Sequence, residues 1–141
     1  MRRSRYRGPV PSYRVSEVAT LLGVSDDTVR RWIDSGRLTS TRDGSGHHVV
    51  DGRVLARVAQ DLAAPPEPGG AQRSTRNRMR GVVTRVVRDT VMAQVEIQAG
   101  PFRLVSLISR EAADELGLEP GVVAVAAVKS TNVAVEHVEA P

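Results

Sequence analysis

The sequence predicts an α+β chain of two domains: a small helical domain with a two-stranded hairpin, then a five-stranded curled β-barrel with one short helix. Apolar residues recur at helical spacing in the first half, whereas short runs of alternating apolar residues follow residue 80. Between them, residues 63–72 offer no large apolar side chain and contain three prolines, which prevent a helix. We therefore expect an arm (1–12), a helical domain (13–64), a linker (65–72) and a barrel domain (73–141).

Two short amphipathic segments separated by Gly23 form the centre of the first domain. Each carries three apolar residues at helical spacing: Val18, Leu21 and Leu22 in the first, and Val29, Trp32 and Ile33 in the second. Neither segment can bury its apolar face alone, so the two helices are expected to pack on each other. Gly23 and Gly36 are placed to end the helices, and Ser25 to cap the second one. This arrangement predicts a helix-turn-helix.

The polar face of the second helix points to a function. If its apolar residues face the core, Thr28, Arg30 and Arg31 face away from it, where a recognition helix contacts the major groove of DNA. Residues 37–48 hold two glycines among polar residues, which predicts a short hairpin, or wing, whose tip approaches phosphates. A helical hairpin with merely solvated arginines is the alternative. The candidate DNA contacts are Ser25, Thr28, Arg30, Arg31, Arg37, Arg42 and His47.

A third helix is expected after the wing. Asp51 is placed to cap it, and its apolar residues lie along one side: Val54, Leu55, Val58 and Leu62. These residues would close a small core over the first two helices.

The pattern from Thr28 to Leu38, with Gly44 to His47, resembles the winged helix-turn-helix of MerR-type and excisionase-like regulators. The resemblance covers roughly the first 64 residues. It departs where the family usually continues the wing with arginines, because His48-Val49 follows here, and this predicts weaker wing contacts to phosphate. His47 and His48 have no third ligand near them in the sequence, so we expect a polar loop tip rather than a metal site.

Charge and composition favour DNA as a partner of the first half. Residues 1–64 carry a net charge of +4 and residues 65–141 carry none, and a basic surface is what phosphate binding requires. The basic arm either adds contacts to DNA or is a solvated tail. The sequence has no cysteine, no apolar run long enough to span a membrane, and Gly8-Pro9 in place of the apolar core of a signal peptide. We expect a cytoplasmic protein.

The second half predicts a small barrel of the oligonucleotide-binding type. The one expected helix is capped by Ser109 and ends at Gly117. A core this small gives a single copy only marginal stability, and we therefore expect an oligomer. The predicted strands are 81–87, 91–97, 102–108, 122–128 and 133–138.

Two polar clusters bracket this barrel: Ser74-Thr75-Arg76-Asn77 before the first strand and Lys129-Ser130-Thr131-Asn132 after the fourth. Each combines a cation with hydroxyls and contains no carboxylate, which suits a small oxyanion. Lys129 is the only lysine in the chain. The alternative is that both clusters are ordinary turns at strand ends.

These clusters, with Gly81-Val82-Val83, Ile108-Ser109, 115–118 and Gly121, resemble the molbindins, or TOBE domains, which bind molybdate. The resemblance covers nearly all of residues 73–139. It implies an oxyanion site between subunits, dimers or trimers of dimers, and molybdate or tungstate as the ligand. It assigns oxyanion contacts to Ser74, Arg76, Lys129 and Ser130, and possible main-chain donors to Ile108 and Ser109.

Together the two halves predict a molybdate- or tungstate-responsive transcriptional regulator that binds double-stranded DNA as a homo-oligomer. The alternative is an intracellular molybdate store whose helix-turn-helix serves assembly or loose DNA binding. We expect no enzyme, because the sequence shows no nucleophile–base pair, phosphate loop or paired carboxylates. An RNA-binding barrel is disfavoured because Phe102 is the only aromatic residue available there for base stacking.

Overall fold

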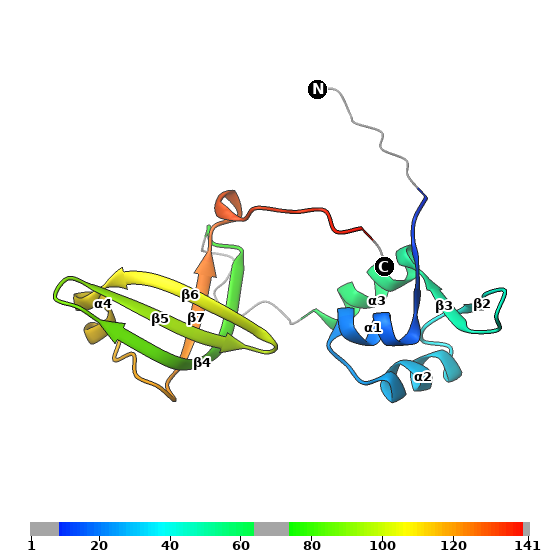
Figure 1. Ribbon diagram of the computed structural model, residues 1–141, viewed down its shortest axis with the longest axis horizontal. Helices are drawn as coiled ribbons and strands as arrows, with labels where there is room; N and C mark the ends of the chain where they lie inside the picture. Colours follow the sequence, from blue (N-terminus) through cyan, green and yellow to red (C-terminus); the bar gives the residue numbers. More distant parts are fainter. Residues whose placement is uncertain (1–8, 64–73, 140–141) are drawn as a thin grey trace, which may run out of the picture. The chain divides into compact units, whose positions relative to one another are not determined.

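The computed structural model describes residues 9–63 and 74–139 (Figure 1). The chain forms two compact units, the first of Met1–Pro65 with Val138–Pro141 and the second of Pro66–His137. The linker expected at 65–72 and most of the basic arm expected at 1–12 lie outside the described residues. No helix in the described ranges is both long and apolar enough to cross a membrane.

The first unit is a helix-turn-helix with a third helix and a small sheet. In chain order its elements are β1 (Ser12–Arg14), α1 (Val15–Leu22), α2 (Asp26–Asp34), β2 (Thr41–Arg42), β3 (His48–Asp51) and α3 (Gly52–Leu62). The sheet has the order β1-β3-β2 and both pairings are antiparallel. The hairpin of β2 and β3 lies where the wing was expected, whereas strand β1 was not predicted.

Each of the three helices and strand β3 contribute at least one side chain to the core of the first unit. Val18, Val29, Leu38 and Val50 are fully buried in it. The prediction for Leu21 was wrong, since its side chain is 60% exposed. Helix α1 packs on the core through the face that carries residues 15, 18, 19 and 22, and residue 21 falls outside that face.

Local hydrogen bonds explain where the helices begin and end. Ser25 Oγ accepts a hydrogen bond from the N–H of Thr28 at 3.1 Å and so caps α2. The Asp51 carboxylate accepts one from the N–H of Arg53 at 2.8 Å and caps α3. Gly23, which follows α1, has a φ of 68°, a conformation that favours glycine. The predicted caps and the turn between α1 and α2 are therefore confirmed.

The second unit is a curled antiparallel sheet with one short helix (Figure 1). Its elements are β4 (Asn77–Arg88), β5 (Met92–Ala99), β6 (Phe102–Ser109), α4 (Arg110–Glu115), β7 (Val123–Val128) and the 3₁₀ turn η2 (Ser130–Asn132). The sheet order is β6-β5-β4-β7. The first half of β4 pairs with β7 and the second half with β5, and the register shifts between Val83 and Arg85. One bent strand thus joins two sheet halves.

The expected fifth strand is not formed. Residues 133–139 have no regular secondary structure, and the described part of the second unit contains four strands. The alternating valines there indicate β-propensity, but a strand also has to pair with another strand, and residues 133–139 pair with none. The prediction of a fifth strand was therefore wrong, and the described residues form a curled four-stranded sheet where a five-stranded OB-like barrel was expected.

The bend in β4 depends on Gly81. A Cβ atom at this position would lie 2.4 Å from the carbonyl oxygen of Gln98 and 2.8 Å from Cγ2 of Ile97. Immediately after the bend, Val83 is fully buried against Val95 and Ile97. Glycine at position 81 thus allows β4 and β5 to approach closely where the sheet curls.

Candidate functional sites

The outward surface of α2 carries the candidate DNA contacts expected from the sequence. Arg30 and Arg31 are exposed, and the Thr28 hydroxyl accepts a hydrogen bond from Nη2 of Arg31 at 3.4 Å. The same hydroxyl lies 2.9 Å from Oγ of Ser25. These four residues form a polar cluster on the first two turns of α2, and its hydroxyls and guanidinium groups are donors suited to phosphate and base edges.

A groove of about 310 Å³ lies beside α2 and the β2–β3 hairpin. Three of the predicted contacts line it, namely Arg30, Arg42 and His47, together with Arg14 and His48. Sequence reasoning missed Arg14 because it precedes the helix pattern. It also placed His48 in a loop tip, whereas this residue lies in β3 with Nδ1 2.8 Å from Oγ of Ser40. The groove wall is rich in cationic side chains, and Asp26 is its one carboxylate.

The hairpin tip is held by the carboxylate of Asp43. It accepts hydrogen bonds from the N–H groups of His47 and Ser45, each at 2.9 Å. The bond from His47, aided by that from Ser45 and by the positive charges of His47 and Arg14, keeps the pKa of Asp43 below its ordinary value. Arg42 donates to the carbonyl of Gly46 at 2.8 Å. The tip is therefore ordered by its own contacts before any partner binds.

Arg37 lies apart from this groove. Its guanidinium carbon stands 5.1 Å from the centre of the Trp32 ring, within the range of a cation–π contact. Arg37 is thus held at the end of α2, while the groove collects Arg30, Arg42 and His47. Among the described residues, no group of three potential ligands includes these histidines or forms a metal site elsewhere.

The second candidate site lies where β4 begins and β7 ends. Asn77 pairs with Val128 in the sheet, and its side-chain amide also donates to the carbonyl of Val128 at 3.1 Å. Ser74 and Arg76 precede this pair, and Lys129 follows it directly. The sheet register therefore brings the two polar clusters together, although 51 positions separate Asn77 from Val128.

The electrostatics of this end favour an anion. The exposed side chains of Ser74, Arg76, Lys129 and Ser130 supply two cations and two hydroxyls. The sequence has no acidic residue from 68 to 88 or from 120 to 135. In η2 the N–H of Asn132 donates to the carbonyl of Lys129 at 2.9 Å, which fixes the turn that presents Lys129 and Ser130.

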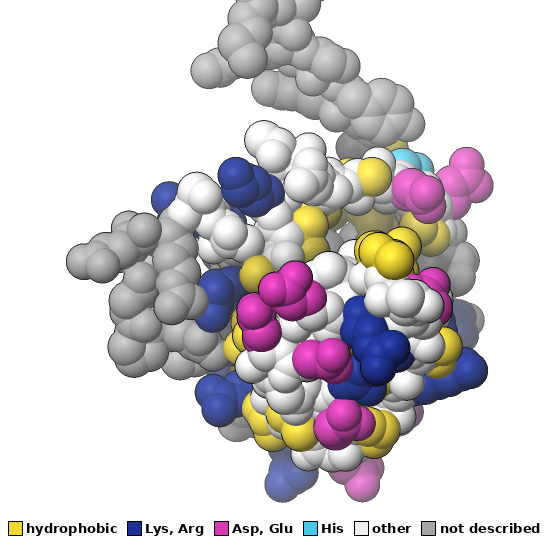
Figure 2. All heavy atoms as spheres, turned by 90° about the vertical axis from the view of Figure 1, so that its left-hand side faces the viewer, with side chains coloured by type: hydrophobic (Ala, Val, Ile, Leu, Met, Phe, Trp, Pro, Cys, Tyr) yellow, Lys and Arg dark blue, Asp and Glu magenta, His cyan; other side chains and the backbone are white. Residues whose placement is uncertain are grey.

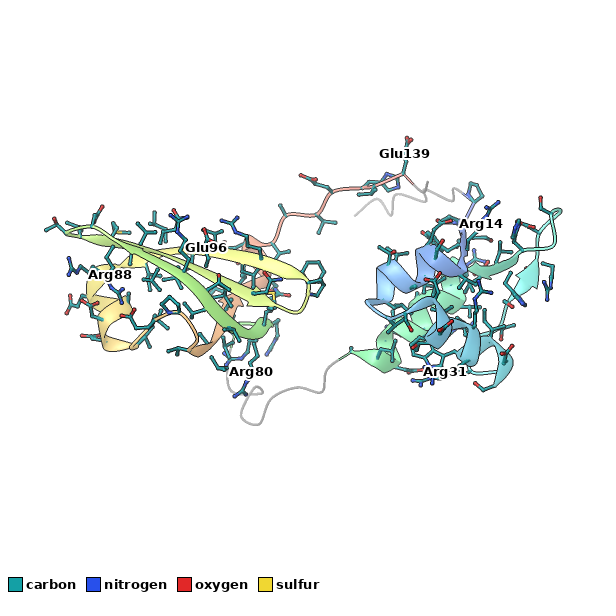
Figure 3. The ribbon with its side chains drawn as sticks, turned by 60° about the horizontal axis from the view of Figure 1, so that its bottom comes forward. Arg14, Arg31, Arg80, Arg88, Glu96 and Glu139 are labelled. Atoms are coloured by element: carbon teal, nitrogen blue, oxygen red, sulfur yellow. The ribbon has the colours of Figure 1, made fainter. Side chains whose placement is uncertain are left out.

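Ser109, the fifth predicted oxyanion contact, lies at the other end of the sheet. It pairs with Met92, next to the Arg88 end of β4, and Figure 3 shows Arg80 and Arg88 far apart along that strand. Its hydroxyl accepts a hydrogen bond from the N–H of Ala112 at 3.0 Å and caps α4. One copy of the chain thus gathers four of the five predicted residues and Ser109 is not with them.

The surroundings of Ser109 differ from those of the cationic end. Figure 2 shows the α4 end of the second unit, where acidic and basic side chains lie side by side. Arg88 donates to the carboxylates of Asp114 and Glu119, both at 3.0 Å, and to the carbonyl of Leu118. These contacts attach the α4 segment to β4, so this end has an evident structural role.

The described geometry defines a class of protein: a helix-turn-helix unit with an arginine-rich face, joined to a curled sheet with a cationic, hydroxyl-bearing end. Comparisons with known families agree. Residues 12–61 match the helix-turn-helix domain model, and residues 73–135 match the TOBE domain model. Through its second half, the chain belongs to the TOBE domain family.

Two similar relatives come from Clostridium pasteurianum. Molybdenum-pterin-binding protein 2 is 38% identical and molybdenum-pterin-binding protein 1 is 34% identical, each over 61 residues. Each alignment covers 43% of this chain and 90% of the relative. A solved structure of a molybdate binding protein from Sporomusa ovata is 32% identical with a TM-score of 0.45, and covers 46% of this chain and 97% of that chain.

Proposed function

We propose that this chain is a transcriptional regulator of the MerR-like winged helix-turn-helix type whose binding to double-stranded DNA responds to molybdate or tungstate. The observation that carries the proposal is the β4–β7 register, which juxtaposes two acid-free clusters of cations and hydroxyls on a chain that also has a helix-turn-helix. In this proposal the protein acts in the cytoplasm as a homo-oligomer, either a dimer or a hexamer, and is not an enzyme.

The ligand half of the proposal assigns a role to each polar residue of the cationic end. Arg76 and Lys129 supply positive charge, and the hydroxyls of Ser74 and Ser130 supply directed donors to a tetrahedral dianion. Ser109 and the main chain of Ile108 contribute only from a second copy, because one copy holds them at the opposite end of the sheet. The names of the two relatives, which mention molybdenum, support molybdate over other oxyanions.

The DNA half of the proposal assigns α2 to the major groove of DNA. Thr28, Arg30 and Arg31 face the bases and nearby phosphates from this helix, and Ser25 lies at its N-terminus. Arg42 and His47 contact the phosphate backbone from the hairpin, and Arg37 contacts it from the end of α2. The net charge of +4 in residues 1–64 supports this assignment, because charge neutralisation supplies much of DNA affinity.

In an oligomer the helix-turn-helix units of two copies are paired. Ligand binding can change DNA affinity only if the oxyanion binds one arrangement of this pair better than another. A site completed by two copies has that property, because the ligand then favours one spacing of the subunits. The same coupling requires DNA to change the affinity for the ligand by an equal factor.

Thermal unfolding of the purified chain in molybdate, tungstate or excess sulfate tests the ligand half. A ligand present at about 100 times its dissociation constant adds about 2.7 kcal/mol to the stability of the native state. Molybdate and tungstate are expected to raise the unfolding temperature of the second unit while sulfate leaves it unchanged. Equal behaviour of all three anions would refute the ligand assignment.

A pair of variants locates the response. Lys129→Ala is expected to abolish the shift and to leave the stability of the ligand-free protein nearly unchanged, because this side chain is exposed. Arg85→Ala removes an exposed cation from β4, away from both Lys129 and Ser109, and is expected to keep the full shift. A shift that survives Lys129→Ala would place the ligand elsewhere.

A further inference from the structure

The charges of the second half of the chain are unevenly distributed, although they sum to zero. Residues 73–88 hold six arginines and no acidic residue. Four acidic residues lie instead in α4 or shortly after it, namely Glu111, Asp114, Glu115 and Glu119. Such a separation of charge gives one end of the second unit a positive surface potential, which attracts an anionic partner.

Three of the arginines lie close together where β4 begins. Side chains alternate between the two faces of a strand, so Arg78 and Arg80 share one face of β4, and Arg76 comes immediately before the strand. We call Arg76, Arg78 and Arg80 the arginine row. Arg76 and Arg80 are exposed and Arg78 is half-buried.

The neighbouring strand places no carboxylate beside the arginine row. Arg78 pairs with Ala127 and Arg80 pairs with Val125. Directly paired residues of antiparallel strands have their side chains on the same face, so short apolar side chains of β7 flank the two arginines. This face of β4 therefore presents guanidinium groups beside a small apolar surface.

The arginine row continues past the proposed oxyanion contacts. Those contacts include Lys129 and Ser130, which follow the pairing of Asn77 with Val128 at the end of the sheet. Arg80 lies three positions inside the sheet from Asn77, which corresponds to about 10 Å along an extended strand. A small oxyanion at the end of the sheet leaves Arg80 to another partner, one with negative charges at several points along a line.

We propose that Arg78 and Arg80 contact the phosphate backbone of double-stranded DNA, beside the stretch that the helix-turn-helix holds. Guanidinium groups bind phosphate oxygens through two parallel hydrogen bonds, and a DNA strand offers phosphates in series. The inference adds a DNA contact to a unit that the proposed function gives only an oxyanion. It rests on the proposed function in one respect, that the chain binds duplex DNA.

Two features favour duplex DNA over a single strand or a separate partner. Surfaces that bind single strands stack successive bases on several aromatic side chains, and Phe102 is the one aromatic residue of residues 65–141. The helix-turn-helix is part of the same chain, so once it binds a duplex, the adjacent backbone is present at a high effective concentration for the second unit.

The salt dependence of DNA binding by the full chain, without added molybdate, tests the contact. Replacing both Arg78 and Arg80 by glutamine is expected to weaken duplex binding and to lower the slope of log affinity against log salt by about 2, because two phosphate contacts are lost. The matched control replaces Arg85 and Arg110, two exposed arginines outside the row, by glutamine. It changes the net charge equally and is expected to keep the wild-type slope.

Two further variants separate the explanations. Replacing Arg78 and Arg80 by lysine keeps both charges and is expected to keep the slope; a loss there would show a structural role of the guanidinium groups and would overturn the proposal. An unchanged slope in the glutamine variant, or an equal loss in its control, would also overturn it. Failure of the proposed DNA-binding helix has a different signature, because Arg31→Ala would then leave the affinity unchanged.

A photo-cross-linking experiment locates the DNA and leaves the arginines intact. The natural chain has no cysteine, so a short photoactivatable group can be attached to Val82→Cys, on the same face of β4 two positions after Arg80. Val87→Cys is the matched control near the other end of β4; the two valines are 44% and 47% exposed. A DNA adduct is expected from position 82 and not from position 87. Equal DNA adducts from both positions, or an adduct of position 82 with protein alone, would refute the DNA contact.

Discussion

Substitution of Gly81 by alanine tests the physical reason for the bend in β4. The added Cβ atom would lie 2.4 Å from the carbonyl oxygen of Gln98 and 2.8 Å from both its carbonyl carbon and Cγ2 of Ile97, whereas ordinary contacts are 3.4–4 Å. Two of these three atoms belong to the backbone of β5, which cannot rotate away as a side chain can. The strands must therefore separate by roughly 1 Å where β4 first pairs with β5.

The expected cost follows from this separation. Overpacking of a close-packed site destabilises the folded state by about 1–3 kcal/mol. Alanine also lowers the entropy of the unfolded chain, which offsets about 0.4–1 kcal/mol of this loss. A value near the upper limit is expected because backbone atoms are involved, so Gly81→Ala should lower the free energy of unfolding by about 2 kcal/mol. For a unit of this size, that corresponds to a fall in Tm of roughly 8–16 °C.

The two units can be followed separately during the same thermal scan. Trp32 is the only tryptophan and lies in the first unit, so its fluorescence reports on that unit, while far-UV circular dichroism also detects loss of the sheet. Gly81→Ala should shift the sheet transition and leave the Trp32 transition in place. Gly44→Ala is the control, because nothing lies within 4 Å of the added atom. If Gly81→Ala lowers the free energy of unfolding of the sheet by less than about 1 kcal/mol, the steric account is refuted.

Three further predictions concern the core, the DNA-binding surface and pH. Leu38→Ala, at a fully buried site, should cost about 2–5 kcal/mol in denaturant unfolding followed by Trp32 fluorescence, whereas Leu21→Ala, at an exposed site, should cost less than about 0.5 kcal/mol. Arg31→Ala should weaken DNA binding and reduce the slope of log affinity against log salt by about 1; an unchanged slope would count against a phosphate contact. The hydrogen-bonded guanidinium of Arg103 lowers the pKa of Glu96 in the folded protein. As the pH falls, Glu96 is therefore protonated at a higher pH in the unfolded chain than in the folded one. Stability from this pair should therefore be present at neutral pH and lost below about pH 4, and urea titrations should show a smaller acid loss for Glu96→Gln.

Features that depend on a few neighbouring residues could be predicted from the sequence. The cap of α2 by Ser25 and the cap of α4 by Ser109 each require only a hydroxyl and an N–H three positions later. The turn at Gly23 likewise requires one residue with positive φ. Such signals are local, and the structure confirms all three.

Features that depend on distant partners were missed or wrong. Strand β1 has three residues, too few for an alternating pattern, and it forms because β3 offers an edge. Leu21 faces solvent because α1 packs on the core through Val15, Val18, Ala19 and Leu22, and residue 21 falls outside that face of the helix. Glu96 has a relative exposure of only 9% in β5, because Arg103 from the neighbouring strand pairs with its carboxylate. A pattern along the sequence does not predict such an ion pair between neighbouring strands.

In the candidate sites, too, features set by neighbouring residues were predicted and features set by distant partners were not. Spacing along the chain indicated two oxyanion-type clusters, but not that they lie together, which depends on the pairing of Asn77 with Val128. The arginines of α2 were predicted from the helical period. Arg14 was not, since it reaches the groove from the start of a different helix. The predicted site residues await the binding experiments above.

The central claim, that an oxyanion controls DNA binding, is tested most directly by one affinity measurement. Fluorescence anisotropy at fixed salt would follow binding to a labelled duplex, selected by the protein from a random library, with and without molybdate. The account predicts that molybdate changes the affinity at least about fivefold, as expected for a coupled pair of sites, and that Lys129→Ala removes the change. A DNA affinity that is the same with and without saturating molybdate would contradict the account.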